Sequence, residues 1–185
     1  MIDGRGLKMT SMPETYITDE MRAYIGTETP PLASPPISQS EIRRFAMAAY
    51  WPEVPPRRFW DVEYAKNTRW GGIVAPAEYN PFAWMVGRAH IGPQPDRVDG
   101  AQEEVESKRQ LRPPGAPERY LFGGTTAAHS FPMRIGDVIT SVVTMAELYE
   151  RTGRLGLMLF YVLEERWTNQ NGDLVQTIRS DNILY

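Results

Sequence analysis

The part of the sequence that most constrains the fold is the C-terminal part, from Leu121 onward. Four segments rich in Val, Ile, Thr, Leu and aromatic residues alternate there with turn signals, which is the pattern of β-strands. The predicted strands span residues 125–133, 137–150, 156–169 and 173–184. Between the last two, Asn171-Gly172 predicts a type I′ hairpin turn, because both of its central residues need a positive φ. Long strands joined by short hairpins predict a strongly curved antiparallel sheet.

One face of such a sheet has to be covered by an apolar element. The best candidate follows the pair Gly71-Gly72, and its apolar residues Tyr79, Phe82, Ala83 and Val86 repeat at helical spacing. Asn80-Pro81 offers the residue types of an N-cap and of the first helical position. The sequence therefore predicts an α+β fold in which a long central helix is wrapped by a curved antiparallel β-sheet.

Residues 1–37 are expected to form an N-terminal extension with one short helix. Thr18 offers the N-cap of this helix and Gly26 offers its end. Four prolines in residues 27–37 exclude a helix interior there.

Residues 38–185 are expected to form a single domain. Its first helix is predicted to begin after Ser38, because Ser38 and Glu41 have the S-x-x-E spacing of a capping box. The apolar face of that helix consists of Ile42, Phe45, Ala46 and Ala49. Residues 87–119 are polar and rich in proline, and they predict a long surface loop inside the domain.

Composition excludes several classes of function. The formal net charge is −3, so no basic excess points to nucleic acid. The absence of cysteine excludes disulfides, thiol catalysis and zinc–thiolate sites, and it is compatible with a cytoplasmic protein. No apolar run approaches the ~20 residues of a membrane span, and the N-terminus has no signal-peptide core. We therefore expect a cytoplasmic protein with no membrane or nucleic-acid partner.

Candidate proton carriers and ligands are few. The two histidines, His90 and His129, are too widely spaced to favour a metal site, and each is expected to be structural or solvent-exposed. His129 lies inside a predicted strand, so its side chain and that of the next residue point to opposite faces. Asp61 and Glu63 do not face each other at a spacing of two on a helix. No phosphate-binding glycine loop precedes a strand–helix unit, so no cofactor or metal is predicted.

Aromatic residues gather between Trp51 and Trp84, which hold between them four of the chain's five tryptophans. Rings cluster in this way either to fill a core or to line a pocket, and composition does not separate the two. Trp70 and Trp84 are the candidates for lining a ligand tunnel.

Four collinear stretches carry a family resemblance: EIRRFAMAA (41–49), FWDVEYAKNTRWGGIVAP (59–76), MRIGDVITSVVTMAELYERTGRLGLMLF (133–160) and ERWTNQNGDLVQTIRSDNILY (165–185). They are similar to the first helix, the acid and Gly-Gly segment before the central helix, the glycine-turn hairpin and the closing hairpin of the MaoC-like dehydratases. The resemblance is to the N-terminal-type, FAS1-like domain of that family. It implies a hot-dog fold and the hydration of enoyl thioesters.

The resemblance also implies a mechanism. In this family an Asp and a His of a D-x-N-P-x-H loop activate water for addition to a trans-2-enoyl thioester, and an amide at the start of the central helix holds the thioester oxygen. Alignment on Asp61 puts Phe59 at the His position, and Phe cannot transfer a proton. The Asp position falls near Glu53 or Val54, and the Asn-Pro pair falls near Pro56-Arg57. Pro76, which precedes the central helix, has no N–H to donate.

We therefore expect a substrate-binding, non-catalytic subunit of an enoyl-CoA hydratase or 3-hydroxyacyl dehydratase, in a homo- or hetero-oligomer. A separate hot-dog chain with an intact D-x-N-P-x-H loop would supply the Asp and His, and the substrate would be an acyl-CoA or acyl-carrier thioester. Two alternatives stay open: a self-sufficient hydratase or thioesterase that uses Glu53, Asp61 or His90, and an acyl-thioester binding or structural module.

The expected binding residues all come from one segment and its helix. They are Phe59, Arg69, Trp70, Gly71, Gly72, Ala75, Pro76, Phe82 and Trp84. Arg57, Arg58 or Arg69 are expected to contact the phosphates of CoA. No catalytic residue is expected in this chain.

Overall fold

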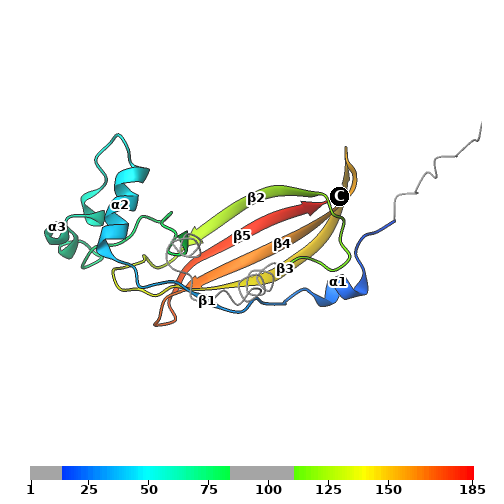
Figure 1. Cartoon of the computed structure of the whole chain (residues 1–185), viewed down its shortest axis with the longest axis horizontal. Coiled ribbons are helices and arrows are strands. Elements are labelled where there is room, and N and C mark those ends of the chain that lie inside the picture. Colours follow the sequence, from blue (N-terminus) through cyan, green and yellow to red (C-terminus); the bar gives the residue numbers. More distant parts are fainter. Residues whose placement is uncertain (1–13, 84–110) are drawn as a thin grey trace, which may run out of the picture.

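A computed structural model of the chain describes residues 14–83 and 111–185. Its main feature is a long, bowed antiparallel sheet, with two helices gathered beyond one end of it and a third near the other end (Figure 1). The elements are α1 (Asp19–Ala23), β1 (Leu32–Ala33), α2 (Gln39–Ala49), the 3₁₀ helix η1 (Arg57–Phe59), α3 (Val62–Lys66), β2 (Tyr120–His129), β3 (Thr140–Gly153), β4 (Gly156–Thr168) and β5 (Leu174–Leu184).

The sheet contains the four long strands that the sequence predicts. Its order is β1-β3-β4-β5-β2, and every neighbouring pair is antiparallel. The first long strand differs from the prediction of residues 125–133, since β2 begins at Tyr120 and ends at His129. Pro132 has no N–H to donate to a strand partner, which agrees with the strand ending before it.

The hairpin between β4 and β5 corrects one prediction. The Gly172 amide donates to the Asn169 carbonyl (3.0 Å), so the turn is centred on Gln170-Asn171. Gly172 has φ +85°, whereas no non-glycine residue of the described chain has a positive φ. The predicted type I′ turn at Asn171-Gly172 is therefore wrong, because only the glycine takes the left-handed conformation, just after the turn.

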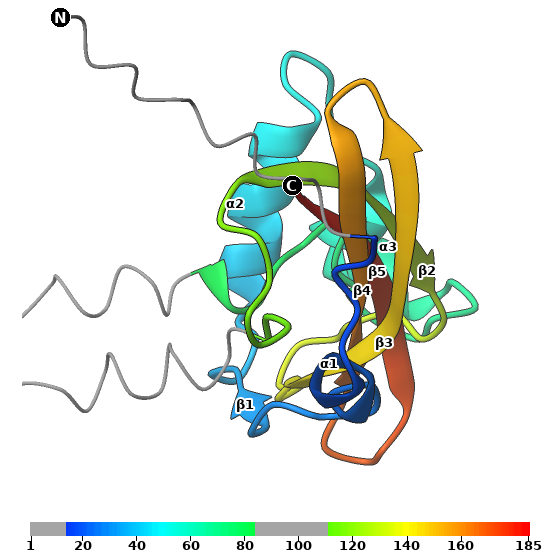
Figure 2. The same cartoon turned by 90° about the vertical axis from the view of Figure 1, so that its right-hand side faces the viewer.

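Three β-bulges bend the sheet. One extra residue interrupts the pairing of β2 with β5, of β3 with β4, and of β4 with β5. The extra residues are Gly123, Ala146 and Val175. Bulges increase local twist and bend the strand that carries them. Figure 2 shows the resulting sheet from its end, with α2 on one side of it.

The N-terminal extension lies along the edge of β3. Its backbone alternates hydrogen bonds with that edge from Gly26, which donates to Met145 (2.8 Å), to Ile37, which donates to Asp137 (2.9 Å). Thr29 and Ser34 donate at intermediate positions, and β1 is the two-residue part of this segment that pairs as a strand. The prolines of residues 27–37 exclude a helix, as expected, and the sequence did not indicate that the segment would cover a sheet edge.

Both predicted N-terminal helices are present with their caps. Thr18 accepts a hydrogen bond from the Met21 amide (3.2 Å) at the start of α1. At α2 the capping box is complete, since Ser38 Oγ accepts from the Glu41 amide (3.3 Å) and Glu41 accepts from the Ser38 amide (2.8 Å). On the predicted apolar face of α2, Ile42 and Ala46 are buried, Phe45 is half-buried, and the last position, Ala49, is exposed.

Buried apolar residues form two clusters. The α2 cluster lies under the helices and contains Ile37, Ile42, Ala46, Phe59, Ala65, Ile73, Val74, Ala75, Tyr79, Met133, Ile139, Trp167 and Val175. The α1 cluster contains Met21, Leu111, Met145, Leu159, Tyr161 and Leu184. Leu111 shows that the last part of the predicted polar loop, residues 87–119, returns to the sheet before β2 begins. The rest of that loop, up to residue 110, lies outside the described residues.

The predicted central helix falls mostly outside the described residues. Residues 76–82 form turns, and only Ala83 of the described chain is helical there. Asn80 Oδ1 accepts a hydrogen bond from the Phe82 amide (2.8 Å), which is the contact that an N-cap makes. Trp84, Val86 and His90 lie beyond this point, outside the described residues.

Candidate functional site

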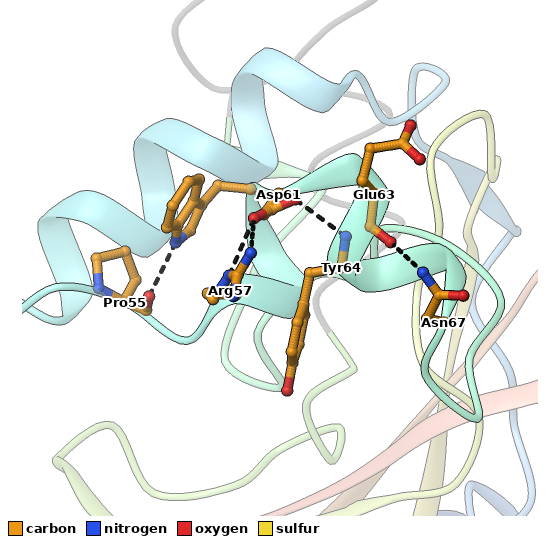
Figure 3. A network of polar contacts seen from close by, with 7 residues as sticks. Pro55, Arg57, Asp61, Glu63, Tyr64 and Asn67 are labelled. Atoms are coloured by element: carbon orange, nitrogen blue, oxygen red, sulfur yellow. Dashed lines mark hydrogen bonds and ion pairs between the residues drawn. The ribbon is translucent and has the colours of Figure 1, made fainter.

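The segment that resembles the family's catalytic loop folds into two short helical turns. One residue, Trp60, separates η1 from Asp61, whose carboxylate accepts from the Tyr64 amide (3.0 Å) and so caps α3. Trp60 is fixed by a hydrogen bond from its indole N–H to the Pro55 carbonyl (2.9 Å). Figure 3 shows this network, in which Asp61 is turned toward Arg57 and the backbone of Tyr64.

Asp61 is engaged as an ion-pair partner and a helix cap. Arg57 Nη2 lies 2.6 Å from its carboxylate. The hydrogen bond from the Tyr64 amide and that from Arg57 both lower the pKa of Asp61 below its usual value. A carboxylate with a lowered pKa accepts a proton poorly at neutral pH, so this geometry does not favour Asp61 as a general base. Glu53, the other described acid of the alternative hypothesis, is exposed.

Phe59 is buried at 3% exposure and belongs to the α2 cluster. Its ring centroid lies 5.9 Å from that of Tyr50. On another side, the Arg58 guanidinium lies 4.4 Å from its centroid. The position where the resemblance implies a catalytic His is therefore filled by a packed aromatic ring.

A pocket of about 210 Å³ lies beside Phe59, and we call it the apolar pocket. Its walls come from η1, from residues 70–77, and from the end of β2 with the turn after it. The lining residues are Arg58, Phe59, Trp70, Val74, Ala75, Pro76, Ala77, His129, Ser130, Phe131, Pro132, Met133 and Val175. Four predicted binding residues thus meet in one cavity.

The two chain stretches that form the apolar pocket are joined by backbone hydrogen bonds. The Ala75 amide donates to the Met133 carbonyl (2.9 Å), and Val74 forms a β-bridge with Arg134. The Val74 amide donates to the Arg58 carbonyl (3.4 Å). Because Pro76 has no N–H, none of residues 74–76 has an amide left to hold a ligand oxygen.

An open hollow of about 430 Å³ adjoins the apolar pocket, and we call it the arginine hollow. It is lined by Arg58, Tyr64, Thr68, Arg69 and Trp70. Arg58 and Trp70 line both cavities. The Arg69 guanidinium lies 4.1 Å from the Trp70 ring centroid, in cation–π geometry. Neither Arg58 nor Arg69 forms an ion pair with another described residue, whereas Arg57 is paired with Asp61.

The other predicted residues have different surroundings. Gly71 has φ +66°, and a Cβ added at Gly71 or Gly72 would meet no atom within 4 Å. Gly71 is therefore needed for its backbone conformation, and a close approach to this glycine pair is excluded among the described residues. Phe82 packs edge-on against Trp167, with centroids 5.2 Å apart, and does not line either cavity.

Sequence reasoning missed the contribution of β2 to the pocket. His129 and Ser130 were expected inside a strand, but β2 ends at His129, and residues 129–133 all line the pocket. The Ser130 amide still bonds to the Val175 carbonyl (2.9 Å). Pro132 was the available signal, because a proline shortly after a histidine predicts the end of the strand there.

Within the described ranges, no group of three or more His, Cys, Asp or Glu residues could hold a metal ion. No helix in the described part of the chain is long and apolar enough to cross a membrane.

Solved structures share the architecture at low sequence identity. The chain resembles the ChsH1-ChsH2 complex from Mycobacterium tuberculosis with a TM-score of 0.59 and 13% identity, over 89% of this chain and 86% of that chain. It resembles the C-terminally truncated HadBC (3R-hydroxyacyl-ACP dehydratase) complex from the same organism with a TM-score of 0.55 and 17% identity, over 86% of this chain and 96% of that chain. It also resembles a MaoC-like dehydratase from Rhodospirillum rubrum, with a TM-score of 0.54 and 16% identity, over 87% of this chain and 92% of that chain. These similarities show the fold alone, which is the predicted α+β hot-dog fold.

No curated protein sequence matches the chain significantly. A family model described as "FAS1-like, dehydratase domain region" matches residues 23–178, which is most of the chain. This match confirms the resemblance that the four collinear stretches indicate. The chain belongs to the FAS1-like dehydratase-region family, a MaoC-like family of hot-dog hydratases and dehydratases.

Proposed function

We propose that this chain is the substrate-binding, non-catalytic subunit of an enoyl-thioester hydratase or 3-hydroxyacyl dehydratase. The observation that carries the proposal is the apolar pocket beside Phe59. Its lining is largely apolar and suits an acyl group, while the loop that the resemblance implies should hold the proton carriers presents a buried ring. Asp61, the nearest acid of that loop, is committed to Arg57 and to the cap of α3.

A partner hot-dog chain with an intact D-x-N-P-x-H loop would then supply the Asp and His. Two of the similar structures are complexes by name, HadBC and ChsH1-ChsH2, which supports assembly with a second chain. In this division of labour the present chain binds the acyl thioester, and the partner performs the proton transfers.

The two adjoining cavities suit an amphiphilic substrate. The acyl group would occupy the apolar pocket, and a phosphate-bearing carrier group would lie in the arginine hollow. Arg58 and Arg69 are the better candidates for phosphate contacts, because Arg57 is neutralised by Asp61. Arginine pairs well with phosphate through charge-assisted hydrogen bonds. Phe59, Trp70, Ala75 and Pro76 would contact the acyl end.

The first experiment tests the binding role. Calorimetry with butyryl-CoA should detect binding to the full chain, and the double variant Arg58→Gln/Arg69→Gln should weaken it about tenfold or more, the loss expected for charge-assisted contacts. Lys66→Gln is the matched control, because Lys66 is a nearby cation paired with Glu63 outside both cavities. Butyryl-pantetheine, which lacks the phosphates of CoA, should bind the double variant and the wild type equally.

The second experiment tests the division of labour. The purified chain should not accelerate the hydration of crotonyl-CoA, and activity should appear on co-expression with a hot-dog chain that keeps the D-x-N-P-x-H loop. Hydration at an enzymatic rate by the chain alone would contradict the non-catalytic assignment. Failure of the wild type to bind butyryl-CoA would contradict the binding role.

A further inference from the structure

A thioester carbonyl placed in the apolar pocket needs a hydrogen-bond donor. Leaving a polar group buried without a partner costs about 1–3 kcal/mol. The Val74 and Ala75 amides are bonded to the Arg58 and Met133 carbonyls, so neither is free to donate to a ligand. A side chain on another wall of the pocket can supply the donor.

His129 is a donor on the wall formed by the end of β2. It is the last residue of β2, it lines the apolar pocket, and its side chain is exposed. Within the described residues, its imidazole has no hydrogen bond or ion pair. An imidazole carries at least one N–H in either protonation state, so it can donate to a ligand oxygen across the neutral pH range.

The neighbouring strand adds a second polar side chain. Gln176 of β5 pairs in register with His129, so the two side chains share one face of the sheet. Gln176 is only 7% exposed, and its side-chain amide has no hydrogen bond to another described residue. The Gln176 side-chain NH₂ group offers a donor for the unprotonated second ring nitrogen of a neutral His129, which would fix the ring orientation.

We propose that His129 donates a hydrogen bond to the carbonyl oxygen of an acyl thioester bound in the apolar pocket. This inference rests on the proposed function and adds a substrate-contacting residue from the sheet. It would take the part of the helix N-terminal amide that the family resemblance implies. Polarisation of the carbonyl prepares the β-carbon of an enoyl thioester for attack by water, whichever chain delivers the water.

The test uses the full chain and butyryl-CoA labelled with ¹³C at the thioester carbonyl. Isotope-edited infrared spectra should show a lower carbonyl stretching frequency in the wild-type complex than in free butyryl-CoA. His129→Leu removes the donor at similar size, so the frequency should return to the free value and Kd should rise about tenfold. His129→Gln keeps an N–H and should retain the shift, with Kd within about threefold of the wild type.

Thr126→Leu is the control, because Thr126 lies on β2 outside the pocket and should leave frequency and Kd unchanged. A wild-type complex with an unshifted carbonyl, or a shift that survives in His129→Leu, would overturn the role of His129 while leaving the binding role intact. A wild type that does not bind butyryl-CoA would overturn the proposed function and this inference together.

Discussion

At the scale of single residues, the buried ring of Phe59 belongs to the core and to the pocket wall at once. Its contacts with Tyr50 and Arg58 explain why the loop keeps a stable shape without a catalytic pair. Asp61 helps to hold the same loop by joining Arg57 to the first turn of α3. In this loop, the acid Asp61 therefore has a structural role, and Phe59 fills the position where a catalytic loop would carry its His.

Asp61 should make the stability of the chain depend on acid pH. Because its pKa in the folded state is lowered, its contribution is present above the usual value of 3.8 and is lost as pH falls through the folded-state pKa. The difference in urea midpoint between the wild type and Asp61→Asn should therefore shrink below pH 3.8. A difference that stays constant into acid would contradict the stabilising role of the carboxylate.

At the scale of elements, the covered edge of β3 was the least predictable feature. Local signals gave the capping box of α2 and the helix after Thr18, because caps depend on residues close in sequence. The docking of residues 26–37 depends on a strand about one hundred positions away. A proline-rich segment has no hydrophobic periodicity from which this docking could be predicted. The shift of the turn to Gln170-Asn171 has a similar cause, since several hairpin geometries accept Asn-Gly.

The docking of this segment depends on Ser34. Ser34 Oγ accepts a hydrogen bond from the buried Ile139 amide (2.9 Å). Ser34→Ala leaves this amide without an acceptor and should lower the free energy of unfolding by about 1–3 kcal/mol. Ser40→Ala, an exposed change in α2, should have little effect. Urea unfolding measures the loss, and hydrogen exchange at Ile139 should become faster. An unchanged exchange rate at Ile139 would contradict the assigned contact.

At the scale of the whole molecule, the α1 cluster and the α2 cluster are separate, and only the α2 cluster contributes residues to the apolar pocket. A loss of packing in the α1 cluster should therefore lower stability without changing the pocket. Leu159 is fully buried in the α1 cluster, and Leu159→Ala should lower the free energy of unfolding by about 2–5 kcal/mol. Butyryl-CoA should still bind the folded variant with a Kd within about threefold of the wild type. Leu155→Ala, at an exposed hairpin position, is the control. A large loss of affinity in Leu159→Ala would show that the two ends are coupled.

The strands follow from sequence pattern more fully than their order or the pocket does, since β2 pairs with β5 and not with the next strand, β3. Alternation and turn residues gave four strands, and the family resemblance gave the position of Phe59. The pocket also needs the end of β2, whereas the predicted strand continued past Pro132 to residue 133 and made His129 an interior strand residue. A cavity between distant segments depends on tertiary register, which one sequence without its fold does not supply.

The hydrogen bond from Ala75 to Met133 ties together two walls that lie far apart in the chain. The pocket therefore exists only when the whole domain is folded, and any molecule that fills it binds the native state alone. Such a ligand raises the melting temperature, by an amount that follows from RT ln(1 + [L]/Kd). A panel of thioesters that differ only in acyl group can thus be ranked by thermal shift, and the preferred acyl chain can be read before any reaction is assayed.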